Sequence, residues 1–285
     1  MYHISRRALL RGGLGLLGGA ALTGCDQNPT SSPAFIGPRS DQVRAAEQAR
    51  GPGAVRDFTL VAAESEVELG GVTARTWAYD GRIPGRPIRV KAGEVIRARL
   101  SNTLPKDTTV HWHGLALRND ADGVPGVTQR PVASGATYVY EFTAPDPGTY
   151  WFHPHTGTQL DRGLYAPLIV EDPNEPLTYD DEWVVVLDDW LDGVTGTPDE
   201  VLAELSGGMG GMDHGGMTGM TEMTPSPTPG TSKHMLMGAT SLLLGGDAGD
   251  VRYPHFLLNG RIATAPETFR AEPGAVAHPD HQRGR

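Results

Sequence analysis

The chain has 285 residues, of which 38 are glycine and 23 are proline, and its formal net charge is −10. This length allows one large or two ordinary domains with a real core. The glycine and proline content favours many short strands and turns over long helices. The negative charge argues against general nucleic-acid binding. The single cysteine, Cys25, excludes an intrachain disulfide.

Residues 1–25 are typical of a targeting segment. A basic start precedes an apolar run at 14–22 that is too short to span a bilayer. The pair Arg6–Arg7 resembles a twin-arginine export signal, and the stretch ending at Cys25 resembles a bacterial lipobox with a lipidated cysteine. We therefore expect an exported protein, either a cell-envelope lipoprotein on the outer side of the bacterial cytoplasmic membrane or a periplasmic one. The alternative is an uncleaved amphipathic start.

A polar, proline- and serine-rich stretch at 26–53 predicts a flexible tether. Residues 54–172 then carry a dense strand pattern. Apolar residues alternate with polar ones at 96–101, and aromatic residues alternate with Val139 and Glu141 at 138–142. Turn signals such as Asp80-Gly81 separate the runs. This pattern predicts an antiparallel sandwich or barrel as the first domain.

A second domain is expected to begin at 173–205, where 181–190 carries a buried-type strand. Residues 206–232 are a low-complexity, methionine-rich insertion that we expect to be flexible. The domain continues over 233–274, where a turn at Asn259-Gly260 separates two further strands within 251–270. A polar tail follows at 275–285.

Two histidine motifs fall where the strand pattern is strong, His111-Trp-His113 and His153-Pro-His155. Residues two apart in a strand point to the same side, so each motif aims two imidazoles one way. The residues between them, Trp112 and Pro154, are expected to point to the opposite face. Four neutral imidazoles from adjacent strands would suit copper, zinc, iron or nickel. The alternative for one pair alone is an exposed strand face.

The flanks of these motifs resemble the multicopper oxidases, the family of laccases and bacterial copper-resistance oxidases. The stretch TTVHWHGLALRNDADGVPGVTQRPV is similar to the family's first copper motif, and DPGTYWFHPHTGTQLDRGLYAPLIVED is similar to its second. The resemblance is close over 54–190 and loose over 251–274. It implies an all-β, cupredoxin-like Greek-key β-sandwich, with one complete domain and the start of a second. It also implies a copper enzyme that oxidises Cu(I) or phenolic substrates and reduces dioxygen to water.

The resemblance assigns site residues by their position in the motifs. In the family's trinuclear cluster, His111 would bind the type 2 copper, and the type 3 pair would be bound by His113, His153 and His155. Asp122 resembles an acid that assists proton delivery, with Asp120 as the neighbouring alternative. Turn formation is the purely structural role open to both acids.

The sequence departs from the family in what it lacks. A blue type 1 copper site needs a thiolate with two imidazoles, and the sole cysteine is Cys25 in the targeting segment. The histidine stretches of the family's last domain are missing as well, so half of the cluster ligands are present. We therefore expect the chain to be inactive as an oxidase on its own.

The family continues with a strand where residues 275–285 are polar. Plausible codons for Ala277 to Arg285, read one base later, encode a strand of the family type, which suggests a single-base frameshift and an aberrant tail. His278 and His281 would then not be ligands. Reading the gene in all three frames tests this hypothesis. A truncated second domain would also predict poor solubility, with proteolysis leaving a core near 54–172.

Soft thioether sulfur selects Cu(I), so the methionine-rich stretch offers candidate Cu(I) sites. Their residues are Met209, Met212, His214, Met217, Met220 and Met223. The stretch resembles methionine-rich segments of bacterial copper-tolerance oxidases, and the alternative is an inert linker.

Other functions stay open beside an oxidase. A copper nitrite reductase would place a type 1 cysteine in the first domain, where this chain has none. A non-catalytic copper-binding lipoprotein, acting as a copper sink or chaperone, would use the half cluster without consuming dioxygen. Zinc could also occupy the histidine pocket. The expected partners are copper ions, dioxygen with a reducing substrate in the intact enzyme, and a membrane through the lipid anchor, with no nucleic acid.

Overall fold

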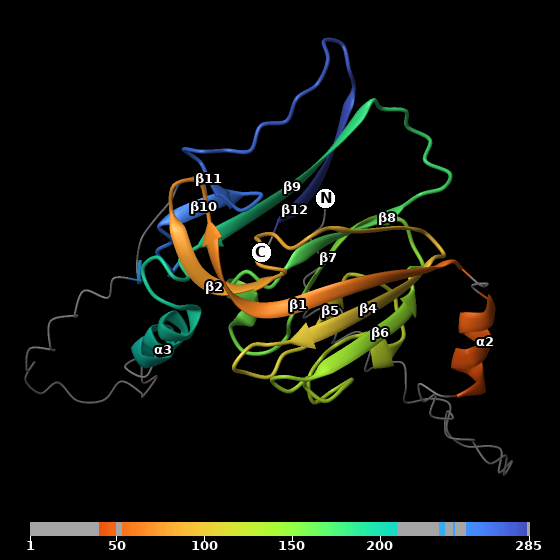
Figure 1. The fold of residues 1–285 in the computed structure, drawn as a ribbon, viewed down its shortest axis with the longest axis horizontal. Coiled ribbons are helices and arrows are strands. Elements are labelled where there is room, and N and C mark those ends of the chain that lie inside the picture. The colour runs from red at the N-terminus through yellow and green to blue at the C-terminus, as the bar shows by residue number, and fades with distance from the viewer. Residues whose placement is uncertain (1–39, 50–52, 210–233, 237–241, 243–248, 284–285) are drawn as a thin grey trace, which may run out of the picture. The chain divides into compact units, whose positions relative to one another are not determined.

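Strands are the main regular structure of the described chain, which a computed structural model gives for residues 40–49, 53–209, 234–236, 242 and 249–283 (Figure 1). The first sheet joins, in this order, β2 (Thr73–Tyr79), β1 (Val55–Glu68), β4 (Val95–Asn102) and β6 (Thr137–Thr143). The second joins β3 (Ile88–Lys91), β8 (Ala166–Glu171), β7 (Gly148–His153) and β5 (His111–His113). The third joins β11 (Arg261–Ile262), β10 (His255–Leu258), β9 (Asp181–Trp190) and β12 (Ala277–Arg283). The helices are α2 (Asp41–Ala49) and α3 (Pro198–Met209), with short 3₁₀ turns η1 (Asn119–Ala121) and η2 (Gln159–Asp161).

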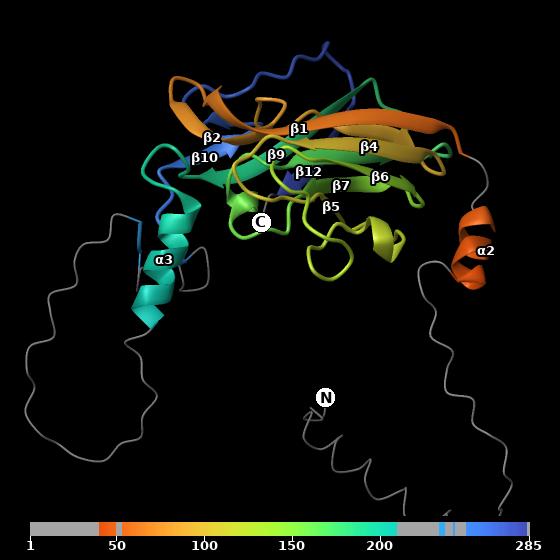
Figure 2. The ribbon, with the colours of Figure 1, turned by 60° about the horizontal axis from the view of Figure 1, so that its bottom comes forward.

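The first two sheets pack face to face and share one hydrophobic core. The alternation in β4 buries Ile96, Ala98 and Leu100 completely, as the period-two pattern predicted. The second sheet contributes Trp112 and Phe152 to the same core. Burying each such large side chain contributes about 1.5–3 kcal/mol. The prediction of an all-β sandwich is confirmed, and Figure 2 shows the stacked layers from the side.

The strand directions differ from the antiparallel pattern that the sequence predicted. β1 pairs with β4 in parallel, and β3 pairs with β8 in parallel. The chain passes from β2 in the first sheet to β3 in the second and back to β4, so β4 reaches β1 through two crossings. The other pairings in these two sheets are antiparallel, as expected. Local alternation identifies strands but not these long-range pairings, so the two parallel ones were not predicted.

The third sheet packs on the first domain. Residues 173–180 are exposed and join β8 to β9. The inner sides of β9 and β10 bury Trp190 and Leu257 against Val67 and Ala74 of the β1–β2 hairpin. The other side of the sheet exposes Phe256, whose exposed fraction is 69%.

The predicted turn between β10 and β11 is present. It is formed by Asn259 (φ +51°) and Gly260 (φ +76°). Positive φ at both positions is what a tight two-residue hairpin turn requires.

Two described segments differ from their predicted character. Within the expected tether, residues 41–49 form α2, which has no buried residue. Within the expected tail, residues 277–283 form β12, which pairs with β9 in parallel. In the described part of the chain, no helix combines the length and the hydropathy needed to span a membrane.

Several predicted features lie outside the described residues. These are the targeting segment with Cys25 and the candidate Cu(I) ligands Met212, His214, Met217, Met220 and Met223. Met209 is the last residue of α3, and its side chain is not described.

Candidate metal centre

Three of the four histidines lie on paired strands: β5 carries His111 and His113, and β7 ends at His153, so His155 lies just beyond the strand in which the sequence placed it. β5 and β7 run antiparallel, with His111 opposite His153 and His113 opposite Trp151. Trp112, between the two ligands of β5, turns to the core as predicted and is fully buried, whereas Pro154 is buried just beyond the end of β7. The Trp112 ring lies 4.9 Å from the ring of Phe142 and 5.3 Å from that of Phe152, between centroids. One face of β5 therefore belongs to the core and the other to the histidines.

The four imidazoles gather at one place. Ring nitrogens of His111, His153 and His155 all lie within 4.8 Å of one another. His113 joins them because its Nδ1 atom is 3.2 Å from Nε2 of His153. The structure thus brings together all four histidines that the sequence singled out.

Hydrogen bonds set the orientation of two of the rings. Nδ1 of His111 lies 2.8 Å from the carbonyl oxygen of Asp122, and Nδ1 of His153 lies 3.0 Å from that of Pro154. A carbonyl oxygen only accepts, so Nδ1 carries the proton in both rings and Nε2 presents a lone pair. Fixing the tautomer in this way is how proteins prepare histidine for a metal.

The cluster favours neutral imidazoles. Burial, with a smaller contribution from the neighbouring histidines, lowers the pKa of His153 to about 4. Burial also lowers the pKa of His113 and of His155, again helped by the adjacent His111. Neutral imidazole is the form that binds metal ions. The donor set therefore fits a transition metal at neutral pH, and no charged ligand is required to hold it.

Of the two candidate acids, only Asp122 lies at the cluster. Its Oδ1 atom is 3.3 Å from Nδ1 of His111, and the residue is partly buried. The exposed Asp120 instead binds the guanidinium of Arg118, with Nε 2.9 Å from Oδ1. Asp122 also ends the 3₁₀ turn η1, so the structural role of this stretch is real as well. Its role as a proton-delivering acid stays a prediction.

Gly123 lets the Asp122 loop lie directly against the start of β5. Its φ is +78°, and a Cβ atom there would lie 1.7 Å from the carbonyl oxygen of Val110. Any other residue would push the loop outward, and with it the carbonyl that holds His111. The close backbone approach is therefore part of how the site is built.

Sequence reasoning missed Trp151. Its ring stacks on His153 with centroids 4.2 Å apart and planes at 29°, and it lies 5.0 Å from the ring of His113. Trp151 is two residues before His153 in the same strand. The period of two that paired the histidines would also have placed it on their side.

A β-sandwich that carries four converging imidazoles has the donor set of a transition-metal site. Residues 61–175 match the sequence profile of the family described as multicopper oxidase. Over 273 residues the chain is 42% identical to the multicopper oxidase MmcO of Mycobacterium tuberculosis. The matched region covers 95% of this chain and 50% of that protein. Over 137 residues it is 40% identical to copper resistance protein A of Pseudomonas syringae pv. tomato, covering 48% of this chain and 22% of that protein.

Solved structures agree. The laccase of Botrytis aclada superposes with a TM-score of 0.50 at 33% identity, covering 54% of this chain and 29% of that one. The blue copper oxidase of Nitrosomonas europaea superposes with a TM-score of 0.57 at 24% identity, covering 81% and 61%, and shows the fold alone.

The resemblance to the multicopper oxidase family that the sequence predicted is confirmed by the profile match and by these relatives. The family's cofactor is copper, and the four-histidine cluster is compatible with part of a copper site. The chain spans half or less of the length of these two curated relatives.

Proposed function

We propose that this chain forms the part of a copper oxidase that holds one half of a trinuclear copper centre. The observation that carries the proposal is the convergence of four imidazoles, from β5, from the end of β7 and from the residues just after it. His111 would hold a type 2 copper, and His113, His153 and His155 would hold a type 3 pair. The adjacent nitrogens of His113 and His153 support their binding the same ion. Copper at such a centre supplies one-electron redox chemistry toward dioxygen, and the intact enzyme would oxidise Cu(I) or phenolic substrates.

The residues of this chain prepare the centre and manage protons beside it. The carbonyl of Asp122 holds the His111 ring, and the Asp122 carboxylate lies beside the same nitrogen. This position suits a group that delivers protons to the pocket. The only cysteine is Cys25, so the chain by itself offers no thiolate for a type 1 copper. Electrons would therefore have to enter the centre through a type 1 site that this chain by itself does not supply.

Metal analysis with an absorbance spectrum tests the proposal. The purified chain should bind copper, lose most of it when His113 and His153 are both replaced by alanine, and show no intense blue band. It should consume no dioxygen with Cu(I) or a phenol. Copper content that is indifferent to both replacements would contradict the proposal. A blue band would show that a thiolate binds copper in this chain, which the proposal excludes.

A second candidate is a copper sink or chaperone without catalysis. It is favoured by the exposure of His113 and His155, which leaves the pocket open to exchange. Rapid transfer of bound Cu(I) to a chelator, without dioxygen consumption even after the missing ligands are supplied by a partner, would select this function over the oxidase.

We also propose that the chain is exported through a twin-arginine route and anchored by a lipid on Cys25. The support is the sequence of the first 25 residues. Incorporation of a labelled fatty acid should be lost in Cys25→Ala. Export should fail when Arg6 and Arg7 are both replaced by lysine. Labelling of the alanine variant would exclude lipidation at this cysteine.

A further inference from the structure

The two segments next to the histidine motifs are joined by two hydrogen bonds, one of them buried. One segment runs from Lys106 to His111, and the other runs from His155 to Arg162. The hydroxyl of Thr108 donates to Oε1 of Gln159 at 2.7 Å, and Nε2 of Gln159 donates to the carbonyl of Asp107 at 2.8 Å. Thr108 and Gln159 are both buried. A displacement of one segment is therefore passed to the other.

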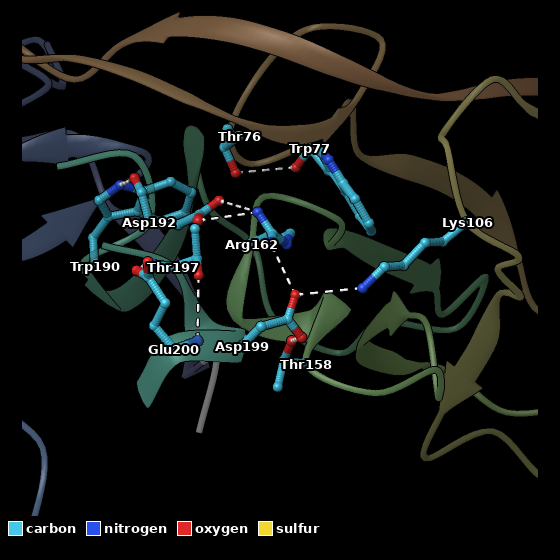
Figure 3. Close-up of polar contacts among 10 residues, drawn as sticks. All are labelled: Thr76, Trp77, Lys106, Thr158, Arg162, Trp190, Asp192, Thr197, Asp199 and Glu200. Carbon is cyan, nitrogen blue, oxygen red and sulfur yellow. Dashed lines mark hydrogen bonds and ion pairs between the residues drawn. The ribbon is translucent and has the colours of Figure 1, made fainter. Parts of the chain in front are cut away.

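A single carboxylate of α3 binds both segments (Figure 3). Oδ1 of Asp199 accepts a hydrogen bond from the Thr158 hydroxyl at 2.8 Å. Its Oδ2 atom lies 3.1 Å from Nη2 of Arg162 and 3.6 Å from Nζ of Lys106. Lys106 lies on the segment that leads to His111, whereas Thr158 and Arg162 follow His155. Hydrogen bonds from Thr158 and Arg162, with the charge of Lys106, hold the pKa of Asp199 below its usual range.

Arg162 is itself fixed on both sides. Its Nη1 atom lies 3.1 Å from each carboxylate oxygen of Asp192, which is fully buried, and its guanidinium carbon lies 4.4 Å from the centroid of the Trp77 ring. Removing Asp192 would leave the buried guanidinium without its buried partner and with Asp199 alone, which is strongly destabilising. Asp199 is different because 48% of its side chain is exposed, so it can be replaced without leaving a buried charge alone.

We propose that Asp199 is a positioning residue for the metal centre. Through Thr158, Arg162 and Lys106 it sets the segments that carry His155 and His111, so the copper affinity of the four-histidine cluster depends on the docking of α3. The inference rests on the proposed function of that cluster as a copper site. It adds that the third-sheet part of the chain, although it supplies no ligand to the cluster among the described residues, controls its geometry.

The test compares Asp199→Ala and Asp199→Asn with Glu200→Gln, a matched loss of one negative charge in the same first turn of α3. The copper affinity of each variant is measured with Cu(II) as the only added ligand, in competition with a chromophoric chelator. Binding that persists in His153→Ala is subtracted as background. Asp199→Ala should weaken the remaining affinity by a few-fold, less than the roughly tenfold or greater loss expected when a direct partner of a metal ligand is removed. Asp199→Asn should lose less because its amide oxygen still accepts from Thr158. Glu200→Gln should match the wild type.

A readout without metal accompanies the titration. Hydrogen exchange of the backbone at 106–110 and 156–162 should rise in Asp199→Ala and stay unchanged in Glu200→Gln. Thr158→Val approaches the same contact from the other side, and combined with Asp199→Ala it should cost less than the sum of the two single changes. This variant also serves if Asp199→Ala does not fold.

The outcomes separate the two proposals. If copper affinity depends on His153 but is the same in wild type, Asp199→Ala and Thr158→Val, the inference about Asp199 is overturned and the proposed function stands. If the wild type shows no binding that depends on His153, the proposed function fails and the inference fails with it.

Discussion

Nδ1 of His113 and Nε2 of His153 lie 3.2 Å apart across the paired strands β5 and β7. Since Nδ1 of His153 already donates to the Pro154 carbonyl, its Nε2 atom carries a lone pair. Two histidine nitrogens about 2 Å from one ion would lie at about this separation. The strand pairing and one backbone hydrogen bond have therefore prepared a chelating pair.

Replacing His153 by alanine should remove most high-affinity copper binding, because it deletes one member of that pair and the stacking partner of Trp151. We expect at least a tenfold loss of Cu(II) affinity, measured by chelator competition. The matched control is His255→Ala, since His255 lies on β10 in the third sheet. Equal losses in the two variants would mean that the cluster is not the site.

The metal-free protein should lose stability as the pH falls from about 6.5 to about 4 because of His153. Its pKa is lowered to about 4 by burial, so the unfolded chain takes up the proton first and is favoured by acid. Chemical denaturation in the presence of a chelator at several pH values measures this. His153→Gln should lose less free energy of unfolding over this range than the wild type. Parallel curves for the two proteins would rule the effect out.

Asp188 should act in the opposite direction. Burial raises its pKa to about 7, although the Tyr165 hydroxyl donates to its Oδ2 atom at 2.6 Å. The folded chain therefore binds this proton more tightly than the unfolded chain. The resulting contribution to the free energy of unfolding is lost as the pH rises from about 4 to 7.

Asp188→Asn keeps an acceptor for Tyr165 and removes the ionisation. The difference in melting temperature between this variant and the wild type should therefore grow in the variant's favour as the pH rises from about 4 to about 7 and level off above that. Asp57→Asn, at an exposed position of β1, is the control and should show no such trend. A difference that does not vary with pH would contradict the assignment.

Gly123→Ala should be far more damaging than Gly126→Ala. The two glycines have φ of +78° and +76°, but only at the first would a Cβ atom meet an obstacle, the Val110 carbonyl oxygen at 1.7 Å, whereas at the second nothing lies within 4 Å. Gly126→Ala should cost about 1–2 kcal/mol for its backbone conformation alone. Gly123→Ala should cost clearly more and also weaken copper binding, because the Asp122 carbonyl moves away from His111. Equal destabilisation, measured by denaturation, would show that the loop relaxes freely.

The part of the site that lies on strands could be predicted from the sequence. The period of two predicted that His111 and His113 share a face and that Trp112 lies in the core, and both follow from local geometry alone. Asn259-Gly260 likewise predicted its hairpin through the conformations those residues tolerate.

The parts that the sequence missed depend on contacts between distant residues. Nothing near Asp199 indicates that Thr158 and Lys106 will meet its carboxylate, since that requires α3 to dock beside two loops of the first domain. The parallel pairing of β1 with β4 depends in the same way on the path of the chain between sheets. The choice between Asp120 and Asp122 also needed coordinates, because Arg118 holds one of them and His111 contacts the other.

β5 is only three residues long, with its outer two side chains facing the metal pocket and its middle one, Trp112, wedged among aromatic rings. A strand of three residues cannot absorb a displacement of its middle side chain without moving the two side chains beside it. A change in the volume of the side chains that pack on Trp112 would tilt the imidazoles of His111 and His113. Conversely, an ion bound by those imidazoles would stabilise the aromatic packing around Trp112. Core packing and metal binding are thus coupled through Trp112. Substitutions that are far from the metal pocket but contact the Trp112 ring are therefore expected to change the metal affinity.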